Sequence, residues 1–275
     1  MTISASLPRA LRAPLAAVID HPSLTWELTK RDVLGRYRGA SFGLFWSLLS
    51  PFLMLSVYTF AFGTVMGSRW PEVESGGASF AIVLFAALIV HGFFAECLTK
   101  APQLVASQPN FVKRVVFPLD VLPWPMVLSA GFHALANLVV FLVLQWVLDG
   151  RVEATALWFP LVLLPLVALA LALGWALSAL GVYLRDIGQV MPLASVALLF
   201  LSSAMVPPSV VPEEHRWLFT LNPLSFIMEQ SRDVLVRGLA PDLGGLALYA
   251  VVAIALACAS RALFERLRRG FADVL

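Results

Sequence analysis

Charged residues are scarce in this 275-residue sequence. Aspartate, glutamate, lysine and arginine make up only 13% of it, whereas hydrophobic residues make up 60%. A water-soluble domain has roughly a quarter of its residues charged, so this chain has too few charges to cover a soluble fold. The formal net charge of +2 also gives no basic surface of the kind that binds nucleic acid. We expect no nucleic-acid partner.

Lysine is rarer still, with only Lys30, Lys100 and Lys113 in the chain. None of the three is followed by serine or threonine, as the lysine of a glycine-rich phosphate loop must be. We therefore expect no bound ATP or Mg²⁺ in this chain. Any ATPase that acts with this chain must therefore be a partner polypeptide, and we expect this chain not to be an enzyme.

Cysteine is limited to Cys97 and Cys258, too few for a disulfide framework or a cysteine metal site. We expect both to be apolar fillers and predict no metal site. Carboxylates are also few, but four of them share one segment and could form an acid–base pair. Their irregular spacing instead favours a solvated face without catalysis. These four are Glu213, Glu214, Glu229 and Asp233.

Ionisable residues are nearly absent from the long apolar runs, although ion-driven carriers usually keep such residues in mid-membrane. His91, His133, Asn137 and Gln145 are the deep polar residues, and Glu96 lies near the end of its run. Five positions separate His91 from Glu96, about 140° around a helix, so the two form no obvious relay. We expect His91 to make an ordinary interhelical hydrogen bond.

Long apolar runs are abundant. A helix needs about 20 apolar residues to cross the hydrocarbon of a bilayer, and six runs approach or exceed that length. We therefore predict an all-α integral membrane protein, one domain over residues 1–275, with six membrane-spanning helices. The predicted spans are 42–66, 79–98, 120–148, 157–184, 189–206 and 244–262.

The segments between the spans also carry predictions. Residues 1–38 form an N-terminal region whose helix, about 22–38, is expected to be amphipathic and to lie at the membrane interface. Residues 100–114 form a polar connection. The proline-interrupted segment 207–243 is predicted to form short re-entrant helices, because its apolar patches are too short to cross alone. Residues 263–275 form a basic tail.

Lysine and arginine are distributed unevenly about these spans. With six spans both termini share one side, and that side carries 14 of the 19 basic residues. Cytoplasmic segments of membrane proteins are enriched in lysine and arginine. We therefore expect a multi-pass protein with both termini in the cytoplasm.

Several short sequences, in order along nearly the whole chain, resemble the permease subunits of bacterial type-2 ABC polysaccharide exporters, which export O-antigen, capsule or teichoic acid. No single motif carries the resemblance. It rests on the stretch 28–39 (LTKRDVLGRYRG) with Leu44, Trp46, Pro51 and Tyr58, then Phe117–Pro118–Leu119, Leu184–Arg185–Asp186–Ile187 and Asn222–Pro223.

This resemblance implies a homodimer of six-span subunits in the bacterial inner membrane, with one continuous channel driven by two copies of a separate nucleotide-binding ATPase. It further implies a coupling helix within 100–114 and an outer gate within 207–238. The expected cargo is a glycan linked to undecaprenyl pyrophosphate, with O-antigen preferred. A type-2 permease for a drug or another lipid is the alternative.

The resemblance also suggests site residues. Arg36, Tyr37 and Arg38, at the membrane boundary, are placed to hold a pyrophosphate headgroup or to anchor the chain in anionic membrane lipid. Aromatic residues near the outer boundary belong either to an interfacial belt or to a channel wall that stacks on sugars: Tyr58, Phe62, Trp70, Trp217 and Phe219. The residues expected to serve ATPase coupling are Lys100, Gln103, Lys113, Arg114, Arg185 and Asp186.

Overall fold

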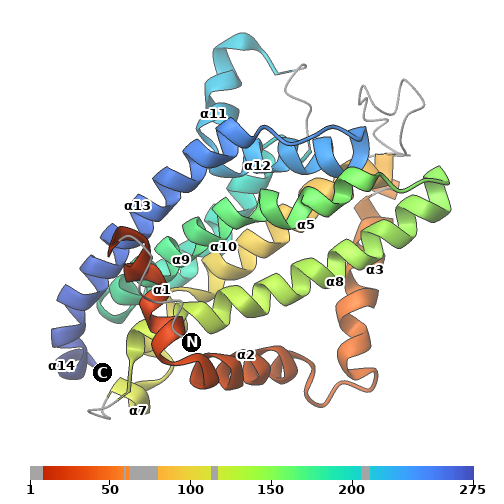
Figure 1. The fold of residues 1–275 in the computed structure, drawn as a ribbon. Coiled ribbons are helices and arrows are strands. Elements are labelled where there is room, and N and C mark those ends of the chain that lie inside the picture. The colour runs from red at the N-terminus through yellow and green to blue at the C-terminus, as the bar shows by residue number, and fades with distance from the viewer. Residues whose placement is uncertain (1–8, 59, 62–79, 113–116, 206–210) are drawn as a thin grey trace, which may run out of the picture.

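The structure is a computed structural model that describes residues 9–58, 60–61, 80–112, 117–205 and 211–275. Within these ranges the chain forms helices and no strand (Figure 1). The helices are α1 (Arg9–Asp20), α2 (Pro22–Tyr37), α3 (Trp46–Tyr58), α5 (Phe80–Lys100), α6 (Gln103–Ala106), α7 (Pro109–Val112), α8 (Pro123–Asp149), α9 (Phe159–Tyr183), α10 (Ile187–Phe200), α11 (Arg216–Leu221), α12 (Pro223–Arg232), α13 (Leu243–Leu267) and α14 (Phe271–Val274).

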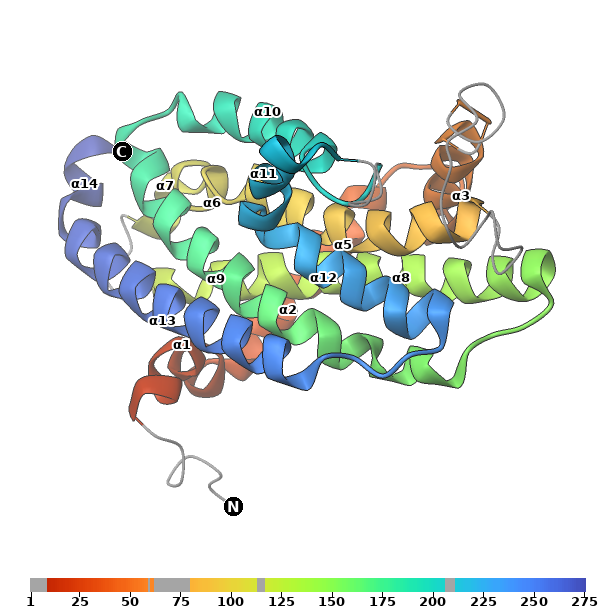
Figure 2. The same ribbon diagram turned by 90° about the horizontal axis from the view of Figure 1, so that it is seen from above.

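Helix α5 is the centre of the bundle. It packs against α8, α9, α10 and α12, and Figure 2 shows it between α10 and α8. Most of its side chains are buried, including Ile82, Ile89 and Phe93. A helix that is apolar all round is stable only when neighbours or lipid cover every face, and here neighbouring helices cover α5.

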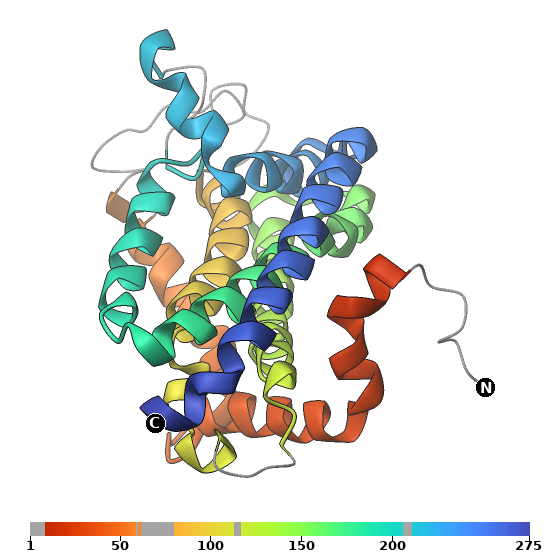
Figure 3. The ribbon, with the colours of Figure 1, turned by 90° about the vertical axis from the view of Figure 1, so that its left-hand side faces the viewer.

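The two ends of the bundle are different. Helix α2 lies across one end, near α7 and α14, whereas α11 stands at the other (Figures 1 and 3). We call these the α2 end and the α11 end. Since α3, α5, α8, α9, α10 and α13 all run between the two ends, residues at the two ends belong to separate sites.

Four of the six predicted spans coincide with helical segments long and apolar enough to cross a membrane: Phe80–Lys100, Leu119–Asp149, Ala154–Tyr183 and Leu243–Val274. The apolar helical segments Gly43–Val57 and Ile187–Phe200 are shorter. The first predicted span, 42–66, runs on into residues outside the described ranges. The fifth was predicted to reach residue 206, but its helix ends at Phe200. Within the described ranges the structure therefore bears out the helical fold and four helices of membrane-spanning length, and the count of six spans stays a prediction.

Helix α2 occupies the segment predicted to form the interface helix, but it does not place all its apolar residues on one face. Leu28 and Val33 are buried, whereas Trp26 and Leu34 are exposed. Two threonines share the buried face because each hydroxyl donates to the carbonyl four residues earlier, at 2.9 Å for Thr25 and 2.8 Å for Thr29. The separation of apolar from polar residues expected of an amphipathic helix is therefore incomplete.

The C-terminal residues pack against the bundle, although we predicted a basic tail from residue 263. Helix α13 continues to Leu267 along α9, and Phe264 and Phe271 are fully buried. The Tyr183 hydroxyl donates to the Leu267 carbonyl at 2.9 Å. Apolar residues interspersed among the arginines hold this segment in place.

Candidate functional site

A polar cavity of about 350 Å³ lies between α2, α3, α5, α8 and α10. Its walls are largely apolar, with the polar groups supplied by four helices. Arg36 and Tyr37 come from the last turn of α2, which ends as the chain turns outward toward Gly39, whose φ of 86° favours glycine. The other polar lining residues are Ser47, Ser50, His91, Glu96, His133 and Asn137.

Four charged residues form a ladder beside this cavity. Asp32 and Arg36 lie one turn apart on α2, and Glu96 and Lys100 lie one turn apart on α5. Asp32 Oδ2 is 2.9 Å from Lys100 Nζ, and Glu96 Oε2 is 2.9 Å from Arg36 Nη1. Lys100 Nζ is also 2.9 Å from Glu96 Oε1. The signs alternate, so every neighbouring contact is attractive, and the ladder fastens α2 to the end of α5.

His133 of α8 joins the ladder from inside the bundle. Its Nδ1 is 2.9 Å from Glu96 Oε2 and 3.2 Å from Arg36 Nη1. Its Nε2 is buried and has no partner among the described residues. A buried polar atom without a partner is costly, so this nitrogen adds to the energetic cost of the site.

Tyr37 and Arg38 lie differently from Arg36. The Tyr37 ring meets His133 edge to face, with centroids 5.9 Å apart. Burial raises the pKa of the Tyr37 hydroxyl, partly offset by the charge of Arg36. The hydroxyl therefore stays protonated at neutral pH and can donate a hydrogen bond. Arg38 is exposed, follows the last residue of α2 and does not line the cavity. The structure thus separates the predicted trio.

Sequence reasoning predicted Arg36 but missed its partners. It compared Glu96 with His91, whereas the histidine that Glu96 contacts is His133, on another helix. His91 instead contacts the Ser195 carbonyl of α10 at 3.1 Å, which confirms the expected interhelical bond. The available signal was charge spacing, because Asp32/Arg36 and Glu96/Lys100 are opposite charges four residues apart near predicted boundaries.

The segment after α5 contacts the turn between α9 and α10. Helix α6 packs on α9, and the Pro102 carbonyl lies so close to Gly181 that no side chain fits there. Gln103 is exposed and lies close to Gly188, because its Nε2 would be 3.1 Å from a Cβ atom placed on that glycine. Arg185 and Asp186 are exposed on the same turn. These predicted coupling residues thus come together at the α2 end.

The remaining predicted coupling residues do not join this surface. The Lys100 ammonium contacts Asp32 and Glu96 within the chain, and its role in ATPase coupling stays a prediction. Lys113 and Arg114 lie outside the described residues. Arg31 of α2 reaches the same segment, where its guanidinium lies 5.9 Å from the ring centre of Phe111.

The α11 end contains an ion network that contradicts one prediction. Glu229 and Asp233 were expected on a solvated face, but their side chains are only 24% and 19% exposed. Glu229 Oε1 accepts from the fully buried Arg232 at 2.6 Å, and Arg237 contacts both carboxylates. The sequence showed a semi-polar segment but could not show that Arg232 and Arg237 pair with these two carboxylates. Glu213 and Glu214 are exposed as predicted.

Asn222 joins α10 to α12. Its amide nitrogen donates to the carbonyls of Leu198 and Leu201 at 2.8 and 3.0 Å, and its Oδ1 accepts from the Leu224 amide at 2.9 Å. One side chain therefore provides hydrogen-bond donors for the carbonyls at the end of α10 and caps the start of α12. Pro223 suits the first helical position there.

Replacing Asn222 with aspartate is expected to destabilise this joint while keeping the α12 cap. Aspartate caps helices as well as asparagine, but its carboxylate faces the two carbonyl oxygens without a proton to donate. We expect a loss of about 1–3 kcal/mol in the free energy of unfolding, measured by thermal unfolding in detergent. Thr220→Val, which removes an exposed bond within α11, is the control and should change little. Equal stability of N222D and wild type would contradict this role.

The predicted channel aromatics are only partly described. Trp217 is exposed on α11, and Phe219 is half-buried in a hollow of about 290 Å³ that Arg216, Thr220 and Glu229 also line. Phe62, Trp70 and the side chain of Tyr58 lie outside the described residues. The choice between an interfacial belt and a channel wall therefore stays a prediction for all five.

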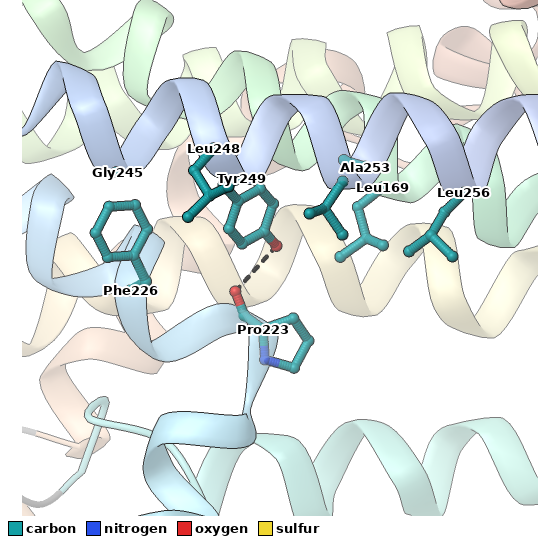
Figure 4. A pocket seen from close by; sticks show the side chains of 9 residues that line it. Leu169, Pro223, Phe226, Gly245, Leu248, Tyr249, Ala253 and Leu256 are labelled. Carbon is teal, nitrogen blue, oxygen red and sulfur yellow. Dashed lines mark hydrogen bonds between the residues drawn. The ribbon is translucent and has the colours of Figure 1, made fainter.

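A second groove, of about 390 Å³, lies between α9, α12 and α13 and is almost entirely apolar (Figure 4). Its one hydroxyl, that of Tyr249, donates to the Pro223 carbonyl at 3.0 Å, and Phe226 stacks on the Tyr249 ring. The lining contains no Asp, Glu, Lys, Arg or His, and its one hydroxyl is already engaged with the Pro223 carbonyl. The polar cavity at the α2 end is therefore the better candidate for substrate contact.

Comparison with known proteins gives a consistent result. The family model described as ABC-2 type transporter matches residues 23–236. The O-antigen export system permease protein RfbA of Myxococcus xanthus is 27% identical over 260 residues, covering 92% of this chain and 96% of the relative. The protein of the same name from Klebsiella pneumoniae is 24% identical, covering 90% and 93%. The polysialic acid transport protein KpsM of Escherichia coli is 24% identical, covering 82% and 86%.

The family match spans the ladder on α2 and α5, the segment 100–114 and the Asn222 joint. It also fits a helical chain with several membrane-length segments and no lysine suited to a phosphate loop. This chain belongs to the ABC-2 type transporter family, as a membrane-embedded permease.

Proposed function

We propose that this chain is the permease subunit of an ABC transporter that exports a lipid-linked polysaccharide, O-antigen on undecaprenyl pyrophosphate, across the bacterial inner membrane. Two copies form the channel, two copies of a separate ATPase supply the energy, and both termini lie in the cytoplasm. The observation that carries this proposal is the similarity to O-antigen export permeases along nine-tenths or more of this chain and of each relative.

The polar cavity supports the proposed point of headgroup binding. Arg36 and Tyr37 line it, and the Arg36 side chain is half exposed. Guanidinium groups bind phosphate through paired hydrogen bonds. Arg38, exposed just beyond α2, adds positive charge nearby. The α2 end then faces the cytoplasm, where the glycan is built.

The size of the cavity supports a homodimer. Its volume of about 350 Å³ is at the lower end for small-molecule sites, about 300–1,000 Å³, and leaves no room for a polymer. The short helices α3 and α10 line it and expose apolar side chains elsewhere, among them Phe52 and Leu193. We propose that a second subunit packs there and completes the channel.

The exposed surface of Gln103, Arg185 and Asp186 is the proposed ATPase dock, with Lys113 and Arg114 as further predicted contacts. Gln103 belongs to a segment fixed to α5 and α9, so a push on it reaches two long helices directly. Lys100 contributes from within, through the ladder.

A complementation assay tests the cargo. A strain that makes lipid-linked O-antigen but lacks its own permease receives this chain together with its ATPase partner. We expect the O-antigen ladder of extracted lipopolysaccharide to return, and to be lost when the ATPase is catalytically inactive. An unchanged O-antigen profile with changed drug resistance would instead favour the drug-permease alternative.

A further inference from the structure

Arg36 is the member of the ladder that can leave it at least cost. If it withdraws, Glu96 keeps Lys100 at 2.9 Å and His133 at 2.9 Å. Breaking a buried pair is costly chiefly because it leaves a charge uncompensated, and no such charge remains here. Arg36 itself is half exposed, whereas Glu96 is only 11% exposed, so water can solvate the released guanidinium.

The contact that holds Arg36 is also weaker than the one a phosphate can offer. Glu96 meets Arg36 through the single nitrogen Nη1, which His133 Nδ1 also approaches at 3.2 Å. A guanidinium has five N–H donors in a planar fork and binds phosphate in a bidentate manner. A doubly charged phosphate can therefore compete with this one carboxylate oxygen.

We propose that Glu96 is an internal stand-in for the substrate phosphate: it holds Arg36 when the cavity is empty and is displaced when a lipid-linked phosphate group binds. This inference rests on the proposed headgroup site at Arg36. The displaced carboxylate then shares its charge between Lys100 and His133 alone.

When a phosphate replaces Glu96 at Arg36, the contacts between α2 and α5 change, and α5 leads into the coupling segment. Lys100 is the last residue of α5, and the chain passes from it through Pro102 into α6. While Arg36 contacts Glu96, two ion pairs of the ladder connect α2 to α5, Arg36–Glu96 and Asp32–Lys100. Once Arg36 contacts the phosphate instead, only Asp32–Lys100 remains of these two. Headgroup binding therefore loosens α2 from the helix that leads to the proposed ATPase dock.

Replacing Glu96 with glutamine tests whether the Glu96 carboxylate weakens headgroup binding. The complex of permease and ATPase is placed in phosphatidylcholine nanodiscs and titrated with undecaprenyl pyrophosphate that carries no glycan. We expect E96Q to bind about tenfold more tightly than wild type, because the competing charge is gone. If E96Q folds poorly, Glu96→Asp is the alternative variant. It shortens the side chain but keeps a charge beside Lys100, and it should also bind the lipid more tightly than wild type.

Matched variants separate the possible failures. Glu27→Gln removes an exposed carboxylate of α2, which contacts Lys30 and not Arg36, and should leave affinity nearly unchanged. If Arg36→Gln abolishes binding but E96Q binds no more tightly, the stand-in role is wrong and the headgroup site holds. If R36Q binds as wild type does, both are wrong. Inorganic pyrophosphate should bind more weakly than the lipid; equal affinity would overturn a lipid ligand.

Discussion

Replacing Arg232 with alanine is expected to be the most damaging single substitution in the described part of this protein. Its side chain is completely buried, and its three nitrogens point to three different partners. Nε donates to the Val83 carbonyl of α5 at 3.2 Å, and Nη2 donates to the Ala204 carbonyl beyond α10 at 3.1 Å. Nη1 binds Glu229 at 2.6 Å. One guanidinium thus ties α12 to two other parts of the bundle.

The expected loss is about 2–5 kcal/mol, the range for truncating a large buried side chain to alanine. Alanine would remove the bonds to both carbonyls, leave a cavity where the side chain was, and leave Glu229 with Arg237 as a partner. We expect R232A to accumulate poorly and to unfold at a lower temperature in detergent, as measured by fluorescence-detected size-exclusion chromatography after heating.

Two further substitutions test whether the loss comes from the three-way bonding of Arg232. Arg232→Lys keeps the charge but cannot reach three directions at once, so its stability should fall between those of wild type and R232A. Arg216→Ala removes an exposed arginine that contacts the exposed Glu213 and donates one bond to the Val211 carbonyl at 3.1 Å, and it should change stability by only about 1 kcal/mol. If R232A were as stable as R216A, Arg232 would not hold α12 in place.

Replacing Gly181 with alanine is expected to separate α9 from the segment that follows α5. A Cβ on Gly181 would overlap the carbonyl oxygen of Pro102 and lie 2.9 Å from its carbon. Both atoms are backbone, so no side-chain rotation relieves the clash. Overpacking of this kind typically costs about 1–3 kcal/mol, and here the helix or the segment has to move.

Because the clash lies beside Gln103, Arg185 and Asp186, we expect G181A to reduce export more than it reduces folding. The measurements are O-antigen export in the complementation assay and the amount of ATPase that co-purifies with the permease. The control is Gly131→Ala in α8, where a Cβ meets nothing within 4 Å and alanine favours the helix. Normal export and normal ATPase recovery with G181A would show that this close approach is dispensable.

The predictions from sequence and the structure agree best where one helix alone decides the outcome. The runs predicted as 79–98, 120–148 and 157–184 coincide with α5, α8 and α9 to within a few residues, because apolar length and proline or glycine at the boundaries are local signals. Boundaries set by distant contacts were missed: α10 ends at Phe200, where Asn222 satisfies its last carbonyls.

The same distinction applies to the site. Arg36 and Tyr37 were predicted from a local motif, and both line the polar cavity. Glu96, His133 and Arg232 gained their roles mainly from partners 28 or more residues away in the chain, although Glu96 also contacts Lys100 and Arg232 also contacts Glu229 nearby. Helical spacing tells which residues share a face, but not which helix that face meets.

The sequence by itself determined that this chain is helical, belongs in a membrane and lacks the lysine of a phosphate loop, because each property follows from composition and local spacing. Only the tertiary structure decided that Lys100 faces Asp32 and Glu96, that Arg232 is buried, and that Pro102 lies against Gly181. Those facts depend on how separate helices pack, and packing brings together residues that the chain keeps far apart.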